Sequence, residues 1–310
     1  MSLARALELA ERGRGTTNPN PVVGAVVERD GRVVGEGWHE RKGGPHAEVV
    51  ALAAAGEAAR GSTLYVTMEP CNHHGTTPPC TDALLAAGVA RVVAGSRDPN
   101  PEAAGGLERL RAGGVEVELV DSFEARALNE AWRTWTSLGR PFVTYKVAVT
   151  ADGLMTQPRS RWITGEESRR LVHELRAGSD AVAVGMGTVR ADDPRLDVRG
   201  APVLRQPRRL AFGRGPLPSG SELELVEGPL EEALARLAAE GVQSLLLEGG
   251  ARLASSFLAA DLVDKLLLFV APQSAGEGLL APLPDPARLS RLDVRAVGED
   301  ALLSAYVHAP

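Results

Sequence analysis

Apolar residues recur at two different spacings in the first part of the chain, and these spacings separate a helix from strands. Segment 2–12 has leucines at helical spacing behind Ser2, a residue type that caps helices, so a helix is predicted there. Segments 22–28 and 32–36 have strand character and flank Asp30-Gly31, a dipeptide typical of a tight hairpin turn. The chain therefore opens with a helix and a β-hairpin.

Helical and strand-like segments then alternate as far as residue 138. The helical ones are rich in alanine, and the strand-like ones are short apolar runs. Such alternation predicts a sheet that is covered by helices on both faces. Helices are expected over about 46–59, 81–87, 104–112 and 121–138, and strands over 63–68, 91–95 and 115–120.

A second alternating series follows Gly139, which is typical of a helix end, and Pro141, which precedes a new strand. We place a domain boundary here, with one domain over 1–139 and another over 140–310. Stretches rich in proline and glycine are predicted to be loops. In this half we expect strands 142–149, 180–185, 208–212, 244–248 and 263–270, helices 166–177, 229–240 and 250–259, and loops 192–202, 213–220 and 272–286.

Composition restricts the class of protein. With 44% hydrophobic and 24% charged residues, the chain resembles an ordinary globular protein. Its net charge of −6 argues against a broad nucleic-acid surface, which needs a basic face. The N-terminus lacks the apolar core of a signal peptide, and no run of 18 apolar residues occurs. We expect a cytoplasmic protein that neither spans a membrane nor binds nucleic acid.

The cysteines and most histidines of the chain lie close together in sequence. His46-Ala47-Glu48 precedes Cys71 and Cys80, which are the only cysteines. Two thiolates and one imidazole leave a zinc ion with an open position, where a bound water has a pKa of about 7. We therefore predict a zinc–water site with His46, Cys71 and Cys80 as ligands, and Glu48 as the group that moves protons between the water and a substrate.

The order of these residues matches the zinc nucleobase deaminases, whose pattern is H-x-E followed by P-C-x-x-C. One feature differs, because eight residues separate Cys71 from Cys80 instead of two. The alternatives are a local disulfide and two unrelated buried thiols. A reducing compartment disfavours the disulfide, and neither alternative explains the run Pro45-His46-Ala47-Glu48.

The longer spacing belongs to a run that resembles the bifunctional deaminase–reductase family of riboflavin biosynthesis. The resemblance extends over essentially the whole chain. In the first half it is carried by Glu69-Pro70-Cys71-Asn72-His73-His74-Gly75-Thr76-Thr77-Pro78-Pro79-Cys80, by Asn18-Pro19-Asn20-Pro21-Val22-Val23-Gly24-Ala25-Val26-Val27, and by Gly44-Pro45-His46-Ala47-Glu48-Val49.

For the first domain, the resemblance implies a cytidine-deaminase-like three-layer αβα fold with one zinc ion per chain. Its reaction would be the deamination of 2,5-diamino-6-ribosylamino-4(3H)-pyrimidinone 5′-phosphate. Asn20, His39 and His73 would contact this substrate. The residues alone leave alternatives open for two of these positions: His39 is equally consistent with a surface histidine at the end of a strand, and Asn20 with a turn residue. His74 is expected to face solvent.

The second half resembles the reductase domain of the same family, whose fold is α/β and similar to dihydrofolate reductase. No G-x-G-x-x-G fingerprint follows any strand, so a Rossmann nucleotide site is not indicated. The resemblance is carried by Lys146-Val147-Ala148-Val149-Thr150-Ala151-Asp152-Gly153, Ser160-Arg161-Trp162-Ile163-Thr164, Gly185-Met186-Gly187-Thr188, Ala191-Asp192-Asp193-Pro194 and Leu247-Glu248-Gly249-Gly250-Ala251.

This likeness implies an NADPH-dependent oxidoreductase that converts the ribosyl group of 5-amino-6-(5-phosphoribosylamino)uracil to ribityl. Lys146 would lie near the carbon that accepts hydride. The implied substrate residues are Ser160, Arg176, Leu196, Arg199 and Glu248, and the implied cofactor residues are Ala148, Trp162, Thr188, Asp192, Gly250, Ala251, Arg252, Leu253, Ala254, Ser255 and Ser256.

The chemistry of these residue types agrees with the implied roles. Guanidinium groups such as Arg176 and Arg199 hold a phosphate by paired hydrogen bonds. Glu248 follows an apolar strand and needs a partner if it is buried, which a substrate amino group would provide. The helix that starts at Gly249-Gly250 favours a cofactor phosphate. The alternatives are that Arg176 is a surface helix residue and that Trp162 belongs to the core.

The chain departs from the family between Pro207 and Glu240, where it is short. There Phe212-Gly213-Arg214-Gly215 replaces a stretch that usually contains aspartate in this family. Arg214 is the residue of this stretch that would bind the 2′-phosphate of the cofactor. An alternative function follows, in which the second domain is inactive and only binds nucleotide or joins subunits. A nucleic-acid base deaminase is a further alternative, which the acidic balance opposes. The family and the apolar strand 263–270 lead us to expect a homo-oligomer, a dimer formed through the reductase domain.

Overall fold

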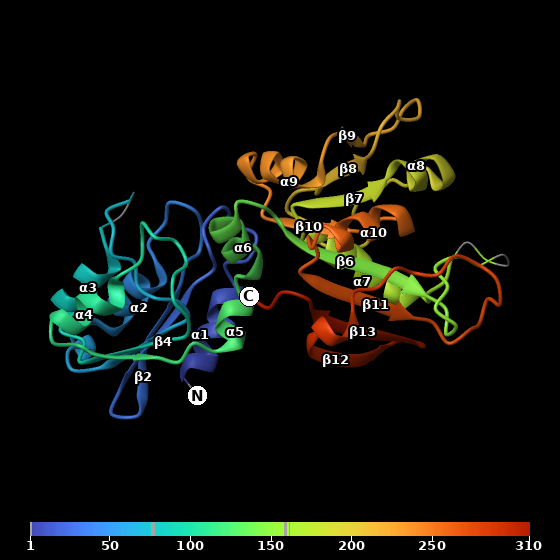
Figure 1. The fold of residues 1–310 in the computed structure, drawn as a ribbon. Coiled ribbons are helices and arrows are strands. Elements are labelled where there is room, and N and C mark those ends of the chain that lie inside the picture. The colour runs from blue at the N-terminus through green and yellow to red at the C-terminus, as the bar shows by residue number, and fades with distance from the viewer. Residues whose placement is uncertain (1, 76–77, 158–159, 161) are drawn as a thin grey trace. The chain divides into compact units, whose positions relative to one another are not determined.

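The computed structural model describes residues 2–75, 78–157, 160 and 162–310. Thr76, Thr77 and Arg161, which belong to the motifs quoted above, lie outside the described residues. The chain forms two compact units, one that ends at Leu138 and one that runs from Gly139 to Ala309 (Figure 1). We call these the first and the second unit.

The first unit contains a five-stranded sheet of order β2-β1-β3-β4-β5. Strand β1 is antiparallel to β2 and β3, whereas β3, β4 and β5 are parallel. The elements are α1 (Ser2–Glu11), β1 (Gly24–Arg29), β2 (Arg32–Trp38), α2 (Ala47–Ala55), the 3₁₀ helix η1 (Gly56–Ala59), β3 (Thr63–Val66), α3 (Cys80–Ala87), β4 (Arg91–Ala94), α4 (Gly106–Ala112), β5 (Glu116–Leu119), α5 (Phe123–Ala127) and α6 (Glu130–Leu138).

Helices cover both faces of this sheet, as the sequence predicts. Helix α1 buries Ala6 and Leu9 against Val26 on one face, while α2, α3 and α4 form the larger apolar core on the other. Helix α2 lies very close to β2, because a Cβ atom at Gly37 would stand 2.5 Å from the backbone nitrogen of Ala51. Only glycine permits this approach, which fixes the helix that begins beside His46.

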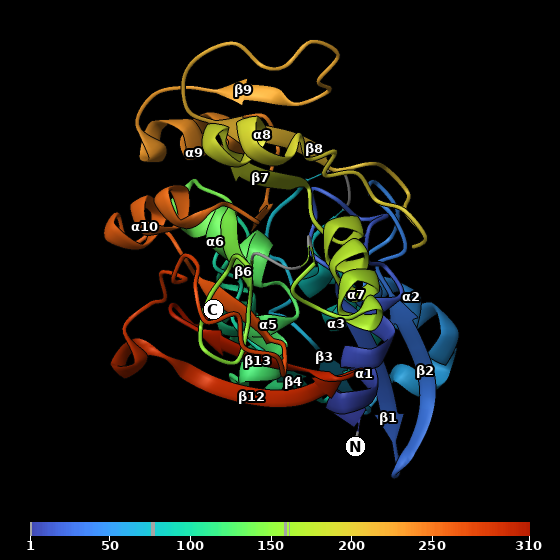
Figure 2. The ribbon, with the colours of Figure 1, turned by 90° about the vertical axis from the view of Figure 1, so that its right-hand side faces the viewer.

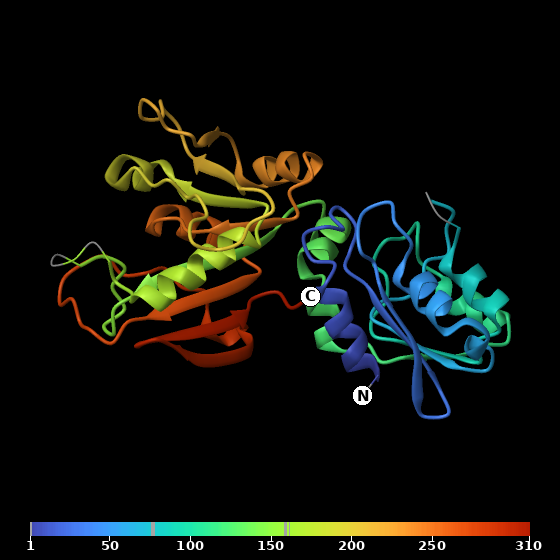
Figure 3. The same cartoon turned by 180° about the vertical axis from the view of Figure 1, so that it is seen from behind.

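The predicted helix over 121–138 is wrong in one respect, because it is two helices, α5 and α6. Between them lies Asn129, whose amide accepts from the N–H of Val22 at 2.9 Å and donates to its carbonyl at 2.8 Å. This pair of buried side-chain bonds ties the junction of the two helices to the segment before β1. Figure 3 shows α1 beside these two helices, and Leu128 packs on Ala10 and Val22.

The second unit contains an eight-stranded sheet of order β12-β13-β11-β6-β10-β7-β8-β9. Six neighbouring strands are parallel, namely β11, β6, β10, β7, β8 and β9. Strand β13 is antiparallel to β11, and β12 is antiparallel to β13. The elements are β6 (Phe142–Val149), α7 (Glu166–Ala177), β7 (Ala181–Gly185), α8 (Met186–Asp192), β8 (Arg208–Phe212), β9 (Glu224–Val226), α9 (Leu230–Ala239), β10 (Ser244–Leu247), α10 (Ala251–Ala259), β11 (Lys265–Val270), the 3₁₀ helix η2 (Pro286–Arg288), β12 (Ser290–Val297) and β13 (Asp300–Tyr306).

Helices lie on both faces of this sheet as well (Figure 2). Helices α9 and α10 bury Leu234 and Phe257 in the main core, and α7 buries Val172 on the opposite face. Helix α8, strand β9 and the β12–β13 hairpin are absent from the sequence prediction. The residues of β12 are almost all exposed, so no buried stripe marks this strand.

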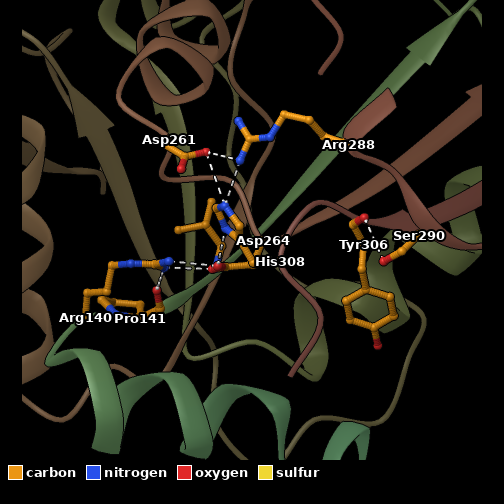
Figure 4. Close-up of polar contacts among 9 residues, drawn as sticks. Arg140, Pro141, Asp261, Asp264, Arg288, Ser290, Tyr306 and His308 are labelled. Carbon is orange, nitrogen blue, oxygen red and sulfur yellow. Dashed lines mark hydrogen bonds and ion pairs between the residues drawn. The ribbon is translucent and has the colours of Figure 1, made fainter. Parts of the chain in front are cut away.

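A buried polar network fixes the beginning of β6 (Figure 4). Asp264 accepts two hydrogen bonds from Arg140 at 2.7 and 2.8 Å, and one from the N–H of Val143 at 2.8 Å. Nδ1 of His308 lies 3.2 Å from the same carboxylate, and Nε2 lies 3.2 Å from Asp261. One carboxylate thus joins the start of β6, the start of β11 and the last residues of the unit.

A second remote carboxylate caps helix α7. Oδ2 of Asp300, on β13, accepts hydrogen bonds from the N–H of Gly165 at 2.9 Å and from the hydroxyl of Ser168 at 2.5 Å. Gly165, the N-cap residue, has no side chain with which to cap the helix, so Asp300 accepts hydrogen bonds at this end of α7 instead. Among the described helices, none is long and apolar enough to cross a membrane.

Candidate active sites

His46, Cys71 and Cys80 meet in the first unit with the geometry of a metal site. Their ligand atoms all lie within 4.8 Å of one another, with 3.2 Å from His46 Nδ1 to Cys80 Sγ and 3.6 Å to Cys71 Sγ. Tetrahedral zinc, with bonds of about 2.0 Å to nitrogen and about 2.3 Å to sulfur, separates such ligands by about 3.5 Å. His46 precedes α2 and Cys80 begins α3, so two rigid helices position these ligands. The three residues therefore fit a zinc ion.

The electrostatics of this cluster favour a thiolate at Cys71 and a carboxyl at Glu48 that carries protons. The hydrogen bond between the two cysteines lowers the pKa of Cys71 to about 4 and raises the pKa of Cys80. Glu48 lies in the first turn of α2 and is only 3% exposed. Burial raises the pKa of its carboxyl to about 7, and the nearby imidazole of His46 opposes this effect. A carboxyl of this kind both accepts and donates a proton near neutral pH.

The structure brings Asn20 and His39 to the same cluster. Nδ1 of His39 lies 3.0 Å from the carbonyl of Pro45, so it donates, and Nε2 accepts from the amide of Asn20 at 3.3 Å. Burial lowers the pKa of His39, which agrees with a neutral ring. The rings of His39 and His46 meet edge to face at 5.4 Å. His39 is therefore a buried residue of the site and not a surface histidine.

These residues line a cavity of about 570 Å³, together with His73. Nδ1 of His73 is buried and has no hydrogen-bond partner among the described residues. His74 is exposed, as expected. Sequence reasoning missed several other lining residues from the ends of β3 and β4 and from α6, namely Glu69, Asp98, Asn100, Glu102, Trp132, Trp135 and Thr136.

One signal for the missed residues is present in the sequence. Asp98-Pro99-Asn100-Pro101 follows β4 and repeats the pattern of polar residues beside prolines seen around Asn20. The ends of parallel strands meet at one edge of a sheet, where ligands bind. Burial raises the pKa of Asp98 to about 6.

In the second unit, the predicted substrate residues Arg176 and Glu248 bind each other. Nε and Nη2 of Arg176 donate to the two carboxylate oxygens of Glu248 at 2.6 and 2.9 Å. Burial opposes ionisation of Glu248, but the hydrogen bonds from Arg176 and the charge of Lys146 hold its pKa below the ordinary value. The sequence led us to expect a substrate amino group as the partner of Glu248, and in the structure Arg176 of α7 is a partner within the protein.

Lys146 lies on β6, beside this ion pair. Its ammonium group lies 5.7 Å from the centre of the Phe269 ring. Burial lowers the pKa of Lys146, while the charge of Glu248 opposes that effect. The three charged groups therefore form one cluster at the centre of the sheet.

Glycines at the ends of β7 and β10 form a cradle next to this cluster. A Cβ atom at Gly250 would stand 2.9 Å from Oγ1 of Thr188, and one at Gly249 would stand 3.2 Å from Cβ of Leu253. Gly250 precedes α10, whose first N–H groups have no partner within the helix. This is a place where a phosphate group approaches the backbone. Thr188, Gly250 and the first turns of α10, which hold residues 251–256, thus lie together.

The other predicted residues of the second unit are spread around it. Leu196 is buried with φ 54°, and Arg199 is exposed and lies 3.3 Å from Asp197. Ala148 is half-buried on β6, and Asp192 is the exposed last residue of α8. The hydroxyl of Ser160 bonds the backbone of Trp162, whose ring lies under the guanidinium of Arg169 at 5.3 Å. Trp162 is 54% exposed, so it does not belong to the core.

Comparison with known families and proteins identifies the chain. The family model described as the RibD C-terminal domain matches residues 141–303, which is more than half of the chain. The chain belongs to the RibD family. A second model, the cytidine and deoxycytidylate deaminase zinc-binding region, matches residues 2–96. His46, Cys71 and Cys80 all lie in this match, and together with their geometry it identifies a zinc site.

Relatives within the RibD family match at high identity. The riboflavin biosynthesis protein RibD of Aquifex aeolicus is 47% identical over 257 residues, which span 78% of this chain and 72% of that protein. RibD of Escherichia coli is 52% identical over 213 residues, which span 67% of this chain and 58% of that protein.

Solved structures of the RibD family match along nearly the whole chain. Acinetobacter baumannii RibD has a TM-score of 0.86 and 37% identity, covering 98% of this chain and 97% of that one. A Thermotoga maritima protein named diaminohydroxyphosphoribosylaminopyrimidine deaminase/5-amino-6-(5-phosphoribosylamino)uracil reductase has a TM-score of 0.85 and 36% identity, with the same coverage. The predicted α/β fold, with a deaminase-like and a reductase-like part, is confirmed.

Proposed function

We propose that this chain deaminates a pyrimidine ribosyl phosphate in its first unit and reduces the deaminated product in its second. One observation carries the proposal: the buried carboxyl of Glu48 shares a cavity with His46, Cys71 and Cys80. The substrates we propose are the two that the name of the Thermotoga relative contains. Membership of the RibD family places both reactions in riboflavin biosynthesis.

In the first unit, His46, Cys71 and Cys80 would hold zinc, which would supply a water with a pKa of about 7. Glu48 would take one proton from the attacking water and pass it to the ring nitrogen. It would then take the second proton, from the hydroxyl group formed by the attack, and pass it to the amino group that leaves as ammonia. One C–O bond forms and one C–N bond breaks. Neutral His39 holds the amide of Asn20, which turns the remaining amide atoms toward the pyrimidine.

In the second unit, bound NADPH would supply a hydride to the ribosyl carbon. The N-terminus of α10 and Thr188 would hold its phosphate groups. Reduction of this carbon opens the sugar ring, and the ring oxygen then needs a proton. Lys146 provides this proton, because burial lowers its pKa. Arg176 positions Glu248, whose carboxylate keeps Lys146 oriented.

Replacing Lys146 by methionine tests this assignment. We expect the rate of reduction to fall by about 10²–10⁴-fold, the usual contribution of a positioned acid. Binding of NADPH and release of ammonia should stay unchanged. The rate is followed as NADPH absorbance with deaminated substrate. The matched control is Lys265→Met on the adjacent strand β11, whose ammonium bonds Tyr306 at 3.0 Å. Equal rates in both variants would contradict the role of Lys146.

The bifunctional assignment has its own test. Purified protein should contain one zinc per chain, release ammonia from the diaminopyrimidine and oxidise NADPH on the product. Ammonia release without NADPH oxidation would favour a second unit that only binds nucleotide or joins subunits.

We also propose that two copies pair through β12, the edge strand of the second sheet. Leu292 and Val294 on this strand are 61% and 59% exposed. The sequence around Val294 complements itself, because antiparallel pairing of two copies sets Asp293 of each against Arg295 of the other. The strand thus combines an open edge, apolar side chains and matched charges.

A charge swap tests this dimer. Wild-type protein should have twice the chain mass of 32.6 kDa in light scattering. Arg295→Asp sets two acidic pairs against each other and should shift the mass toward the single chain. The double variant Asp293→Arg/Arg295→Asp restores the pairing and should recover the dimer. A dimer mass that is the same in wild type, in Arg295→Asp and in the double variant would exclude this edge as the interface.

We place the protein in the cytoplasm, where reducing conditions keep Cys71 and Cys80 as thiols.

A further inference from the structure

Two arginines lie together at the end of β8, and no carboxylate among the described residues pairs with either. Nη2 of Arg190, on α8, donates to the backbone carbonyl of Arg214 at 2.8 Å. Both side chains are exposed, and neither guanidinium forms an ion pair within the part of the chain that the structure describes. A guanidinium carries five N–H donors, so most of them face solvent here. We call Arg190 and Arg214 the arginine pair.

The other end of β8 shows that this charge is not typical of the strand. Arg208 lies 2.6 Å from Glu224 and 2.5 Å from Glu240, and Arg209 lies 2.9 Å from Glu222. Arginines at the start of β8 are therefore neutralised by neighbouring glutamates. The arginine pair at its carboxyl end is not, and a surface of this kind attracts an anion.

The backbone holds the arginine pair in place. Gly213 has φ 137°, and a Cβ atom there would stand 2.9 Å from Cγ of Met186, the first residue of α8. Its N–H also donates to the carbonyl of Val226 on β9 at 3.1 Å. The chain that leaves β8 is thus pressed against α8, which carries Arg190. Two segments far apart in sequence present their arginines at one place.

The position of the pair along the sheet indicates which anion it binds. Strands β6, β10, β7 and β8 are consecutive neighbours, and all four are parallel. At their carboxyl edge, Lys146 and Glu248 lie toward β6, and the cradle of Gly250 and Thr188 joins β10 to β7. The arginine pair lies beyond it, between β7 and β8. Strands are about 4.8 Å apart, so β8 lies about 10 Å from β10.

A dinucleotide with its reactive ring near Lys146 and its pyrophosphate at Gly250 points its adenosine end toward β8. Ligands of open α/β sheets follow the carboxyl edge in this way, and arginine near the adenosine ribose accommodates a 2′-phosphate. We propose that Arg190 and Arg214 bind the 2′-phosphate of the cofactor and make the second unit selective for NADPH over NADH. The inference rests on the proposed reductase function and names the residues that choose its cofactor.

Direct binding tests the proposal without turnover. Isothermal titration of the full-length protein with NADPH, NADH, adenosine 2′,5′-bisphosphate and 5′-AMP separates the 2′-phosphate from the rest of the cofactor. We expect Arg190→Ala/Arg214→Ala to weaken NADPH and the bisphosphate by about 10- to 100-fold, the range for hydrogen bonds to charged groups. NADH and 5′-AMP should bind as they do to wild type.

Two further variants sharpen the result. Arg205→Ala removes an arginine from the same unit whose side chain is 76% exposed and is expected to change nothing. Arg214→Glu sets a negative charge against the phosphate and should lower the affinity for NADPH further, with NADH unaffected.

Four outcomes decide between these possibilities. Unchanged NADPH affinity in the double variant would overturn the inference, and so would an equal loss for NADPH and NADH. A wild-type protein that binds neither dinucleotide would overturn the reductase function itself, and the inference with it. A selective loss for the ligands that carry a 2′-phosphate supports both.

Discussion

Replacing Glu48 by glutamine should lower the rate of ammonia release by about 10²–10⁴-fold, the range attributed to a positioned acid or base. The side chain is 3% exposed and opens into the cavity of His46 and Cys71. Glutamine keeps the shape and removes the ability to accept a proton, so the substrate should still bind. Ammonia release is measured with a coupled assay at saturating substrate.

Two controls accompany the Glu48 variant. Zinc content should stay at one per chain, because the carboxyl is not among the clustered ligand atoms. Reduction of deaminated substrate in the second unit should keep its rate. Glu57→Gln, at an exposed position of η1 close in sequence, should leave both reactions unchanged. Ammonia release that survives in Glu48→Gln would remove Glu48 from the proton transfer.

Replacing Asp264 by alanine should lower the free energy of unfolding of the second unit by about 3–5 kcal/mol, the usual cost of leaving a buried charge unpaired. The Arg140 side chain is 14% exposed and depends on this carboxylate, as does the N–H of Val143. Urea unfolding followed by circular dichroism measures the change. Asp261→Ala removes a carboxylate of the same network that is 57% exposed, and should cost at most about 1 kcal/mol. Equal losses in the two variants would refute this account.

The same network gives stability a dependence on pH. Burial works against ionisation of Asp264, but hydrogen bonds from Arg140 and His308 outweigh it and lower the pKa. The carboxylate therefore stabilises the fold above its unfolded pKa of about 3.9 and loses this effect as the pH falls through the folded value. The hydrogen bond to Asp264 raises the pKa of His308. That contribution is complete below the unfolded pKa of about 6.5 and is lost as the pH rises through the folded value. In Asp264→Ala both slopes should flatten.

The zinc cluster was predictable because each of its ligands lies within a short motif. His46 and Glu48 are two residues apart at the start of one helix, and Cys80 begins another, so local patterns contain the geometry. The alternating elements of both units were also predictable, since helices and strands here have distinct apolar periods. The roles of Asn20, His39 and His73 at the substrate stay predictions, although the structure brings all three to one cavity.

The parts that sequence reasoning missed depend on contacts between distant residues. Arg176 and Glu248 are 72 positions apart, and neither position shows that one neutralises the other. At the junction of α5 and α6, Asn129 bonds Val22, which is 107 positions away. Strand β12 was not predicted from the sequence, because neither of its faces is buried. The contacts of Arg176 and Asn129 are made with residues distant in sequence, and the local sequence pattern does not identify those residues.

The strand order of the second unit determines when its reaction centre can form during synthesis. β6, which carries Lys146, is the first strand of this unit to be made, yet it lies between β10 and β11. The first neighbour, β10, is complete only at Leu247 and the second, β11, only at Val270, and Asp300, which caps α7, is synthesised later still. The first unit has all its strands and metal ligands by Leu138. Once Leu138 has been synthesised, the nascent chain therefore contains all the strands and metal ligands that the first unit needs to fold and bind its metal. Strand β6, which carries Lys146, is synthesised next and at first has no neighbouring strand with which to pair.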